Sequence, residues 1–231
     1  MNKNIKIISA IISSSLATIH LLNRMIYAAA TKNDILSNIE DQYYEWRFGK
    51  IHYVKKGSGK PLLLVHDLTV GSSGYEFHKI INQLSKQYEV YAIDLLGYGL
   101  SDKPNMTYTS FLYVQLLTDF IKTVIGKKTD IIATGDTSSI AIVTCHNNPE
   151  VFNKLVFINP QSLYQLNLIP TKRTKTLKIL IDLPVIGTFI FNIITSKYSF
   201  LQTFRKNYFS KSTLLKKRDL LAYREASHIY E

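Results

Sequence analysis

Apolar residues follow two spacings along the middle of the chain, and these spacings predict strands and helices in turn. Continuous apolar runs at Pro61–His66 and Tyr88–Ile93 predict strands buried on both faces. After each run, apolar residues recur every three or four positions, which predicts helices at Phe77, Ile80, Ile81 and Leu84, and then at Leu112, Leu116, Leu117, Phe120, Ile121 and Val124. Because strands and helices alternate at this spacing, we expect an α/β fold with a doubly wound, mostly parallel sheet.

Shorter signals place the other elements. Tyr43–Phe48 and Ile51–Val54 alternate around a glycine, which predicts a β-hairpin at the edge of the sheet. The sequence Ser73-Gly74-Tyr75-Glu76 has the pattern of a capping box and predicts a helix start. Two further strands are predicted at Asp130–Thr134 and Lys154–Ile158.

The first thirty residues form a separate hydrophobic segment. Lys3 and Lys6 precede an apolar run from Ile7 to Leu22, and Arg24 follows it. We expect an N-terminal membrane anchor in residues 1–30, with a cleaved signal or a helix packed on the domain as alternatives. The flanking charges are balanced, so topology stays open, and without an anchor we expect a cytoplasmic protein. Residues 31–42 are polar and are interpreted as a linker.

Composition and charge narrow the classes of function. The 231 residues are 46% hydrophobic, as in a globular protein, and the single cysteine, Cys145, excludes an intramolecular disulfide framework. The net charge of +11 is uneven, because residues 161–231 carry +8 whereas residues 61–160 are slightly acidic. No nucleic-acid-binding motif or zinc-ligand spacing is present, so we expect neither nucleic acid nor a metal or other cofactor. The charge fits an anionic membrane surface or a lysine-rich solvated face.

A turn between strand and helix is the candidate catalytic motif. Asp130–Thr134 predicts a strand, a helix is expected from Ser138, and Gly135-Asp136-Thr137-Ser138-Ser139 lies between them. This spacing resembles a nucleophile elbow, with Thr137 at the nucleophile position and small residues on both sides. Ser138 is the backup nucleophile if the turn slips by one residue, which would put Asp136 and Ile140 where small residues are needed. An ordinary strand-turn-helix is the alternative interpretation.

Two more motifs occur in an order that resembles the α/β-hydrolase family. Asp94–Asp102 follows a strand and resembles that family's Asp-x-x-Gly-x-Gly-x-Ser loop, and Leu64–Leu68 resembles its His-Gly turn, with Asp67 in place of glycine. The resemblance covers Tyr43–Pro160. It implies that the N–H groups of Leu68 and Ser138 form the oxyanion site.

The resemblance also predicts the remaining domains. We expect a hydrolase core at residues 43–160 and a helical cap at 161–231, with a membrane-lying helix around Pro184–Ile194 as the rival interpretation. The family's base and acid are expected after the cap and are not found, so the chain is either a fragment or a degenerate relative. We therefore expect a hydrolase of an ester or another small apolar substrate, or a membrane-anchored binding protein without turnover. An apolar acyl or ring system is the expected ligand.

Overall fold

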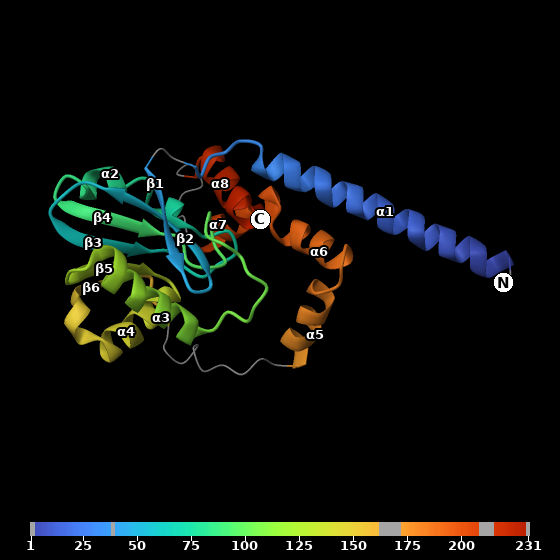
Figure 1. Cartoon of the computed structure of the whole chain (residues 1–231). Coiled ribbons are helices and arrows are strands. Elements are labelled where there is room, and N and C mark those ends of the chain that lie inside the picture. The colour runs from blue at the N-terminus through green and yellow to red at the C-terminus, as the bar shows by residue number, and fades with distance from the viewer. Residues whose placement is uncertain (1–2, 38–39, 162–171, 208–214, 230–231) are drawn as a thin grey trace. The chain divides into compact units, whose positions relative to one another are not determined.

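A computed structural model describes residues 3–37, 40–161, 172–207 and 215–229 (Figure 1). The chain divides into two compact units. The first comprises residues 1–34 and 169–224, and the second comprises residues 35–168 and 225–231. The division into anchor, linker, core and cap that the sequence predicts uses different boundaries and stays a prediction.

The second unit is built on a six-stranded sheet with the order β1-β2-β4-β3-β5-β6. Strand β2 pairs antiparallel with β1 and β4, while the β4-β3-β5-β6 part is parallel. The predicted mostly parallel sheet with an edge hairpin is therefore confirmed. The strands are β1 (Asp41–Trp46), β2 (Gly49–Lys56), β3 (Lys60–Val65), β4 (Tyr88–Ile93), β5 (Thr129–Thr134) and β6 (Phe152–Ile158).

Strand β3 lies in the middle of the sheet and explains the continuous apolar run. Leu63 and Val65 belong to a core cluster shared with α3 (Ser110–Phe120) and α4 (Thr137–Asn147) on one face. Leu62 and Leu64 belong to the cluster on the other face, under η1 (Gly74–Phe77) and α2 (Ile81–Leu84) (Figure 1). Because both faces of the sheet are covered by helices, the side chains that point to either face are apolar, and the apolar run in β3 is continuous.

The capping-box segment differs from its prediction. Residues 74–77 form a short 3-10 helix, η1, and α2 follows only at Ile81–Leu84. Ser73 Oγ accepts the Tyr75 N–H at 3.4 Å, as a cap does. The Glu76 carboxylate instead accepts the Thr134 hydroxyl at 2.9 Å and the Asp67 N–H at 3.3 Å. Because the Glu76 carboxylate binds Thr134 and Asp67, it does not accept the backbone N–H of Ser73 that would complete a capping box, and a short 3-10 helix forms here in place of a long helix.

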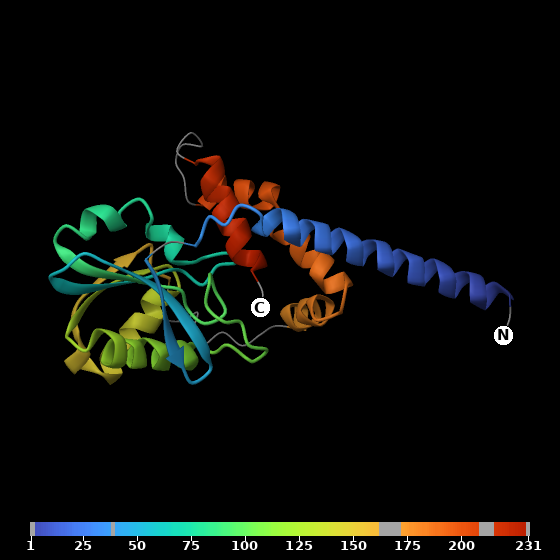
Figure 2. The same cartoon turned by 45° about the horizontal axis from the view of Figure 1, so that its top comes forward.

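The first unit is helical. Its elements are α1 (Lys3–Thr31), α5 (Lys172–Ile181), α6 (Ile186–Ile194), α7 (Lys197–Asn207) and the first part of α8 (Lys217–His228). In α1 the buried or half-buried positions Ile19, Asn23, Ile26 and Ala30 recur at helical spacing, whereas residues 4–18 are exposed on all sides. Helices α1 and α6 lie side by side near these positions (Figure 2).

A buried pair of asparagines joins α1 to α6 within this unit. Asn192 Nδ2 donates to Asn23 Oδ1 at 2.8 Å, and Asn23 Nδ2 donates to the Val185 carbonyl at 2.9 Å. Polar atoms buried between helices need such partners. Within the described residues, α1 is also the helix that is long and apolar enough to cross a membrane, by length and composition alone.

Candidate active site

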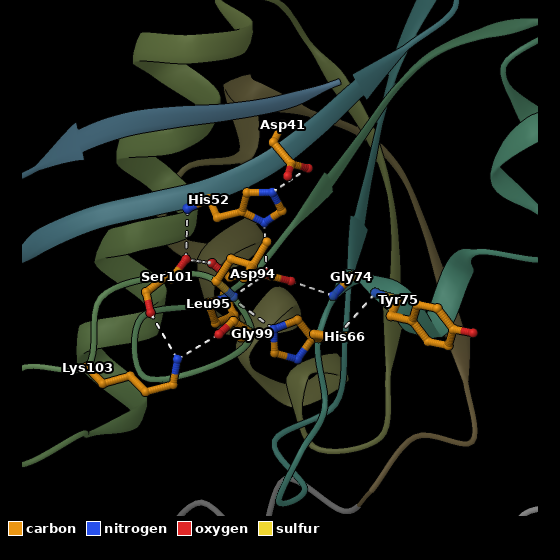
Figure 3. A network of polar contacts seen from close by, with 12 residues as sticks. Asp41, His52, His66, Gly74, Tyr75, Asp94, Leu95, Gly99, Ser101 and Lys103 are labelled. Atoms are coloured by element: carbon orange, nitrogen blue, oxygen red, sulfur yellow. Dashed lines mark hydrogen bonds and ion pairs between the residues drawn. The ribbon is translucent and has the colours of Figure 1, made fainter. Parts of the chain in front are cut away.

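The loop after β4 is fixed by a buried carboxylate. Asp94 Oδ1 accepts the Gly74 N–H at 2.6 Å (Figure 3). Asp94 Oδ2 accepts the Leu100 N–H at 2.8 Å. Gly99 has a φ of 50°, and a Cβ there would overlap the Asp94 carboxylate, so glycine is required at this position. The Asp-Gly-Gly-Ser motif therefore ties the β4 loop to the start of η1 and shapes the carboxyl edge of the sheet.

A histidine from the hairpin completes this network. His52 Nδ1 lies 2.8 Å from Asp94 Oδ2, and His52 Nε2 lies 2.9 Å from Asp41 Oδ1 (Figure 3). Burial alone would lower the pKa of His52, but the charge of Asp94, the hydrogen bond that the ring donates to Asp94 and the close contact with Asp41 raise it to about 8. Burial alone would raise the pKa of Asp94, but His52 and the N–H donors lower it to about 2. The pair is therefore ionised at neutral pH.

His66 fixes the backbone of the turn after β3. Its Nε2 lies 2.9 Å from the Leu95 nitrogen, whose N–H can only donate, so Nδ1 carries the ring proton. Nδ1–H donates to the Asp67 carbonyl at 2.7 Å, while the Asp67 N–H is bound by Glu76. The fully buried His66 is thus a positioning residue, and it holds the Asp67 backbone at the carboxyl edge of the sheet.

The elbow turn differs from the predicted arrangement at Thr137. Gly135 is the residue with positive φ, 56°, between β5 and α4, and Thr137 is already the first residue of the helix. The Thr137 side chain is fully buried, and its hydroxyl donates to the Thr134 carbonyl at 2.8 Å. Thr137 therefore does not occupy the strained nucleophile position that the sequence predicts for it, because that position falls two residues earlier, on a glycine.

Ser138 is also engaged in the helix start. Its N–H donates to the Gly135 carbonyl at 3.2 Å, and its buried hydroxyl donates to the Ala133 carbonyl at 3.3 Å. Neither group faces an open site, so the geometry supports neither the predicted oxyanion role of Ser138 nor its backup role as nucleophile.

Two other N–H groups converge at the carboxyl edge of the sheet. The Leu68 N–H and the Asp136 N–H both donate to Asp67 Oδ1, each at 2.8 Å. The N–H of Leu68, which the sequence predicts as an oxyanion donor, thus shares its acceptor with the N–H of Asp136 and not with that of Ser138. A negatively charged oxygen, that of Asp67, already sits between them.

Gly135 and Asp67 are complementary in shape. A Cβ on Gly135 would overlap the carbon and both oxygens of the Asp67 carboxyl group. The side chain that the His turn gains at Asp67 thus fills the space that the elbow leaves at Gly135. The sequence contains a signal for an elbow centred on Gly135: small residues, Ala133 and Thr137, stand two positions before and two positions after it.

The electrostatics of this edge are negative. Burial and the nearby charge of Asp67 raise the pKa of Asp136. Burial, with contributions from Asp67 and Asp136, raises the pKa of Tyr98 to about 12, and its hydroxyl donates to the Leu68 carbonyl at 3.0 Å. Among the described residues, no group of three or more histidine, cysteine or acidic side chains could hold a metal ion. The edge can therefore present a carboxylate, two N–H donors and a phenol.

Comparison with known proteins covers the same part of the chain. Residues 60–176 match the family model of the alpha/beta hydrolase fold. A 2-hydroxy-6-oxo-6-(2'-aminophenyl)hexa-2,4-dienoic acid hydrolase of Metapseudomonas resinovorans is 30% identical over 48% of this chain and 39% of its own. Soluble epoxide hydrolase of Corynebacterium sp. (strain C12) is 28% identical over 48% of this chain and 38% of its own length. Haloalkane dehalogenase 2 of Mycobacterium bovis is 35% identical over 32% of this chain and 26% of its own length.

The chain spans less than two fifths of the length of each of these three relatives. Among solved structures, an alpha/beta hydrolase fold protein from Burkholderia ambifaria has a TM-score of 0.61, at 17% identity over 79% of this chain and 63% of its own. An epoxide hydrolase without ligand has a TM-score of 0.59, at 18% identity over 82% of this chain and 68% of its own. The sheet order, the three motifs and the match to half of its residues show that the chain belongs to the α/β-hydrolase fold family.

Proposed function

We propose that the chain is part of a hydrolase that cleaves a small apolar substrate at the carboxyl edge of its sheet. One observation carries this proposal: the N–H groups of Leu68 and Asp136 converge on a single point, Asp67 Oδ1. Two backbone donors aimed at one oxygen are the arrangement that stabilises an oxyanion during hydrolysis. The proposal gives the oxyanion role to Leu68 and Asp136 and assigns no reaction to the buried hydroxyls of Thr137 and Ser138.

The similar proteins support the substrate class. The names of two of them, an epoxide hydrolase and a haloalkane dehalogenase, give an epoxide and a haloalkane as substrates. The match to the family model, residues 60–176, includes the His66 turn and the elbow. We therefore assign a small, uncharged and largely apolar molecule to this chain.

The proposal includes membrane association through α1. Residues 4–18 of this helix are exposed and largely apolar, and the helix has 29 residues, or about 43 Å at the usual rise. That length exceeds the roughly 30 Å hydrocarbon core of a bilayer. Full-length protein in cells should stay in the membrane pellet after alkaline carbonate extraction, whereas Ile8→Asp/Ile12→Asp protein should be released. Release of the unmodified protein would contradict the anchor.

A second candidate function, ligand binding without turnover, has its own observation. The strained position of the elbow is occupied by Gly135, which has no side chain to act as a nucleophile. A protein with this turn could keep the family's binding crevice and perform no chemistry.

Turnover assays separate the two candidates. Purified full-length protein in mild detergent is given a short-chain nitrophenyl ester, an alkyl halide and an aryl epoxide, and product release is measured. Turnover by the unmodified protein that falls at least tenfold in Leu68→Pro, which removes one N–H donor, supports the hydrolase. Saturable quenching of the Trp46 fluorescence without any product supports the binding protein.

A further inference from the structure

Helix α6 has an apolar side in addition to the side that binds α1. Its buried Asn192 bonds to Asn23 of α1. Ile186, Ile190 and Ile193 recur at the i, i+4, i+7 spacing, so they form a stripe along another side of the helix. Ile186 is 40% exposed and Ile193 is 57% exposed. The described part of the first unit therefore leaves this apolar stripe uncovered.

The exposed apolar surface continues into the end of α5. Ile179 is 64% exposed and Leu183 is 40% exposed. The two helices meet in a tight corner, because a Cβ on Gly187 would overlap the Ile181 carbonyl oxygen and the Gly187 N–H donates to the Leu183 carbonyl at 2.8 Å. We call residues 172–194 the α5–α6 corner. Its exposed apolar side chains are held together by this close packing.

The charge of the same region is almost entirely positive. Residues 172–207 contain seven basic residues and a single acidic one, Asp182, which pairs with Lys178 at 3.0 Å. Lys172 and Lys197 are exposed, and Tyr198, next to Lys197, is 71% exposed. Lysines beside exposed isoleucines, with a tyrosine at their margin, are the composition of a helix that lies on an anionic lipid surface.

Helix α1 fixes the level of this corner relative to a bilayer. Residues 4–22 measure about 28 Å at the usual helical rise, which is close to the roughly 30 Å hydrocarbon core. The polar residues Asn23 and Arg24 follow directly. Asn23 bonds to Asn192 at 2.8 Å and to the Val185 carbonyl at 2.9 Å. The corner therefore meets α1 at the position where an inserted anchor would leave the lipid.

We propose that the α5–α6 corner lies on an anionic lipid surface, with the isoleucines of α6 at the headgroup boundary and the lysines among the lipid phosphates. This inference rests on the proposed anchoring through α1 and extends it, since the corner adds a second contact with the bilayer surface. A second copy of the chain is a poorer occupant, because two surfaces of the same charge repel each other. The lipid layer also concentrates small apolar molecules, so this contact holds the chain beside its proposed substrates.

Lipid contact of α6 can be measured in full-length protein reconstituted into vesicles. Cys145→Ser removes the only cysteine, and Ile193→Cys or Thr188→Cys then carries a nitrobenzoxadiazole dye at a single position. Thr188 is exposed on the opposite side of α6 from the stripe, so it is the matched control. The vesicles contain phosphatidylcholine, about one quarter phosphatidylglycerol and a spin-labelled lipid. We expect at least threefold stronger quenching of the dye at position 193 than at position 188.

A second measurement does not depend on the anchor. Full-length Ile8→Asp/Ile12→Asp protein, in which α1 no longer inserts, should still sediment with vesicles that contain phosphatidylglycerol. It should bind less to pure phosphatidylcholine and less at high salt, because the lysines attract the anionic headgroups. Ile193→Asp in this background should weaken vesicle binding at least tenfold. Thr188→Asp adds the same charge on the other side of α6 and should weaken binding less than about threefold.

The outcomes separate the corner from the rest of the proposed function. Equal quenching at positions 193 and 188, or equal weakening by Ile193→Asp and Thr188→Asp, overturns the proposal. A dye at position 193 that is shielded from water but not quenched by lipid also overturns it, because protein would then cover the stripe. Release of the unmodified protein by carbonate contradicts the anchor, whereas vesicle binding by the Ile8→Asp/Ile12→Asp protein still supports the corner. Turnover tests the hydrolase independently of both.

Discussion

Substituting Gly135 by alanine should destabilise the second unit because of Asp67. At a φ of 56°, any residue other than glycine is strained by about 1–2 kcal/mol. The new Cβ would also overlap the Asp67 carboxyl group, which could escape only by leaving its two N–H donors. Those bonds to a charged acceptor contribute about 1.5–3 kcal/mol each, and part of that loss is recovered by solvation. We expect a total destabilisation of about 4 kcal/mol.

A double-mutant cycle separates the two causes. In an Asp67→Gly background the overlap disappears, so Gly135→Ala should cost only the backbone strain, about 1–2 kcal/mol. The coupling between the two positions should therefore be about 2–3 kcal/mol. Urea unfolding followed by Trp46 fluorescence measures it, because Trp46 is the only tryptophan and is buried in the second unit. Equal costs of Gly135→Ala in both backgrounds would refute the close packing of Asp67 on the elbow.

Three further predictions use other parts of the molecule. The pKa of His52 rises from 6.5 to about 8 on folding, so protonated His52 contributes about 2 kcal/mol to the free energy of unfolding below pH 6.5, and this contribution is lost as pH rises through 8. Urea unfolding at a series of pH values should show this loss of stability, and the pH dependence should vanish in His52→Gln. Asn23→Ala should destabilise the first unit by about 1–3 kcal/mol, because it removes the buried hydrogen bonds of Asn23 with the Asn192 amide and with the Val185 carbonyl. Faster proteolysis within residues 186–207 would reveal this loss, whereas unchanged protection would contradict it. Strand β6 ends the sheet with Val156 and Ile158 exposed, so Val156→Lys should lower concentration-dependent association in sedimentation velocity; equal association would refute an edge contact.

The sheet could be predicted from the sequence because its signals are local. The apolar run at β3 and the alternation in the hairpin each report burial of their own residues, and both predictions are confirmed. The turn of the hairpin lies slightly earlier than predicted: it is formed by Arg47 and Phe48, and Gly49, the predicted turn residue, already begins β2. The prediction of a capping box is wrong because Glu76 accepts a hydrogen bond from Thr134, a residue far away in the sequence.

The site could be predicted only in part. Leu68 and the His66 turn were located by their motif. The register of the elbow could not be fixed, since small residues flank both Gly135 and Thr137, and the choice depends on which residue adopts a positive φ. That choice is coupled to Asp67, whose carboxylate needs the space above a glycine. No pattern within one segment contains this information, because the contact joins two turns that are 68 positions apart in the chain.

The amide resonances of Leu68 and Asp136 test the central claim most directly. In isotope-labelled full-length protein, both amide protons should resonate downfield, because each is donated to the same carboxylate oxygen, Asp67 Oδ1. Both should move upfield together in Asp67→Ala, which removes the acceptor. Amide protons of Leu68 and Asp136 that keep their positions in Asp67→Ala would show that Asp67 does not bridge the two donors.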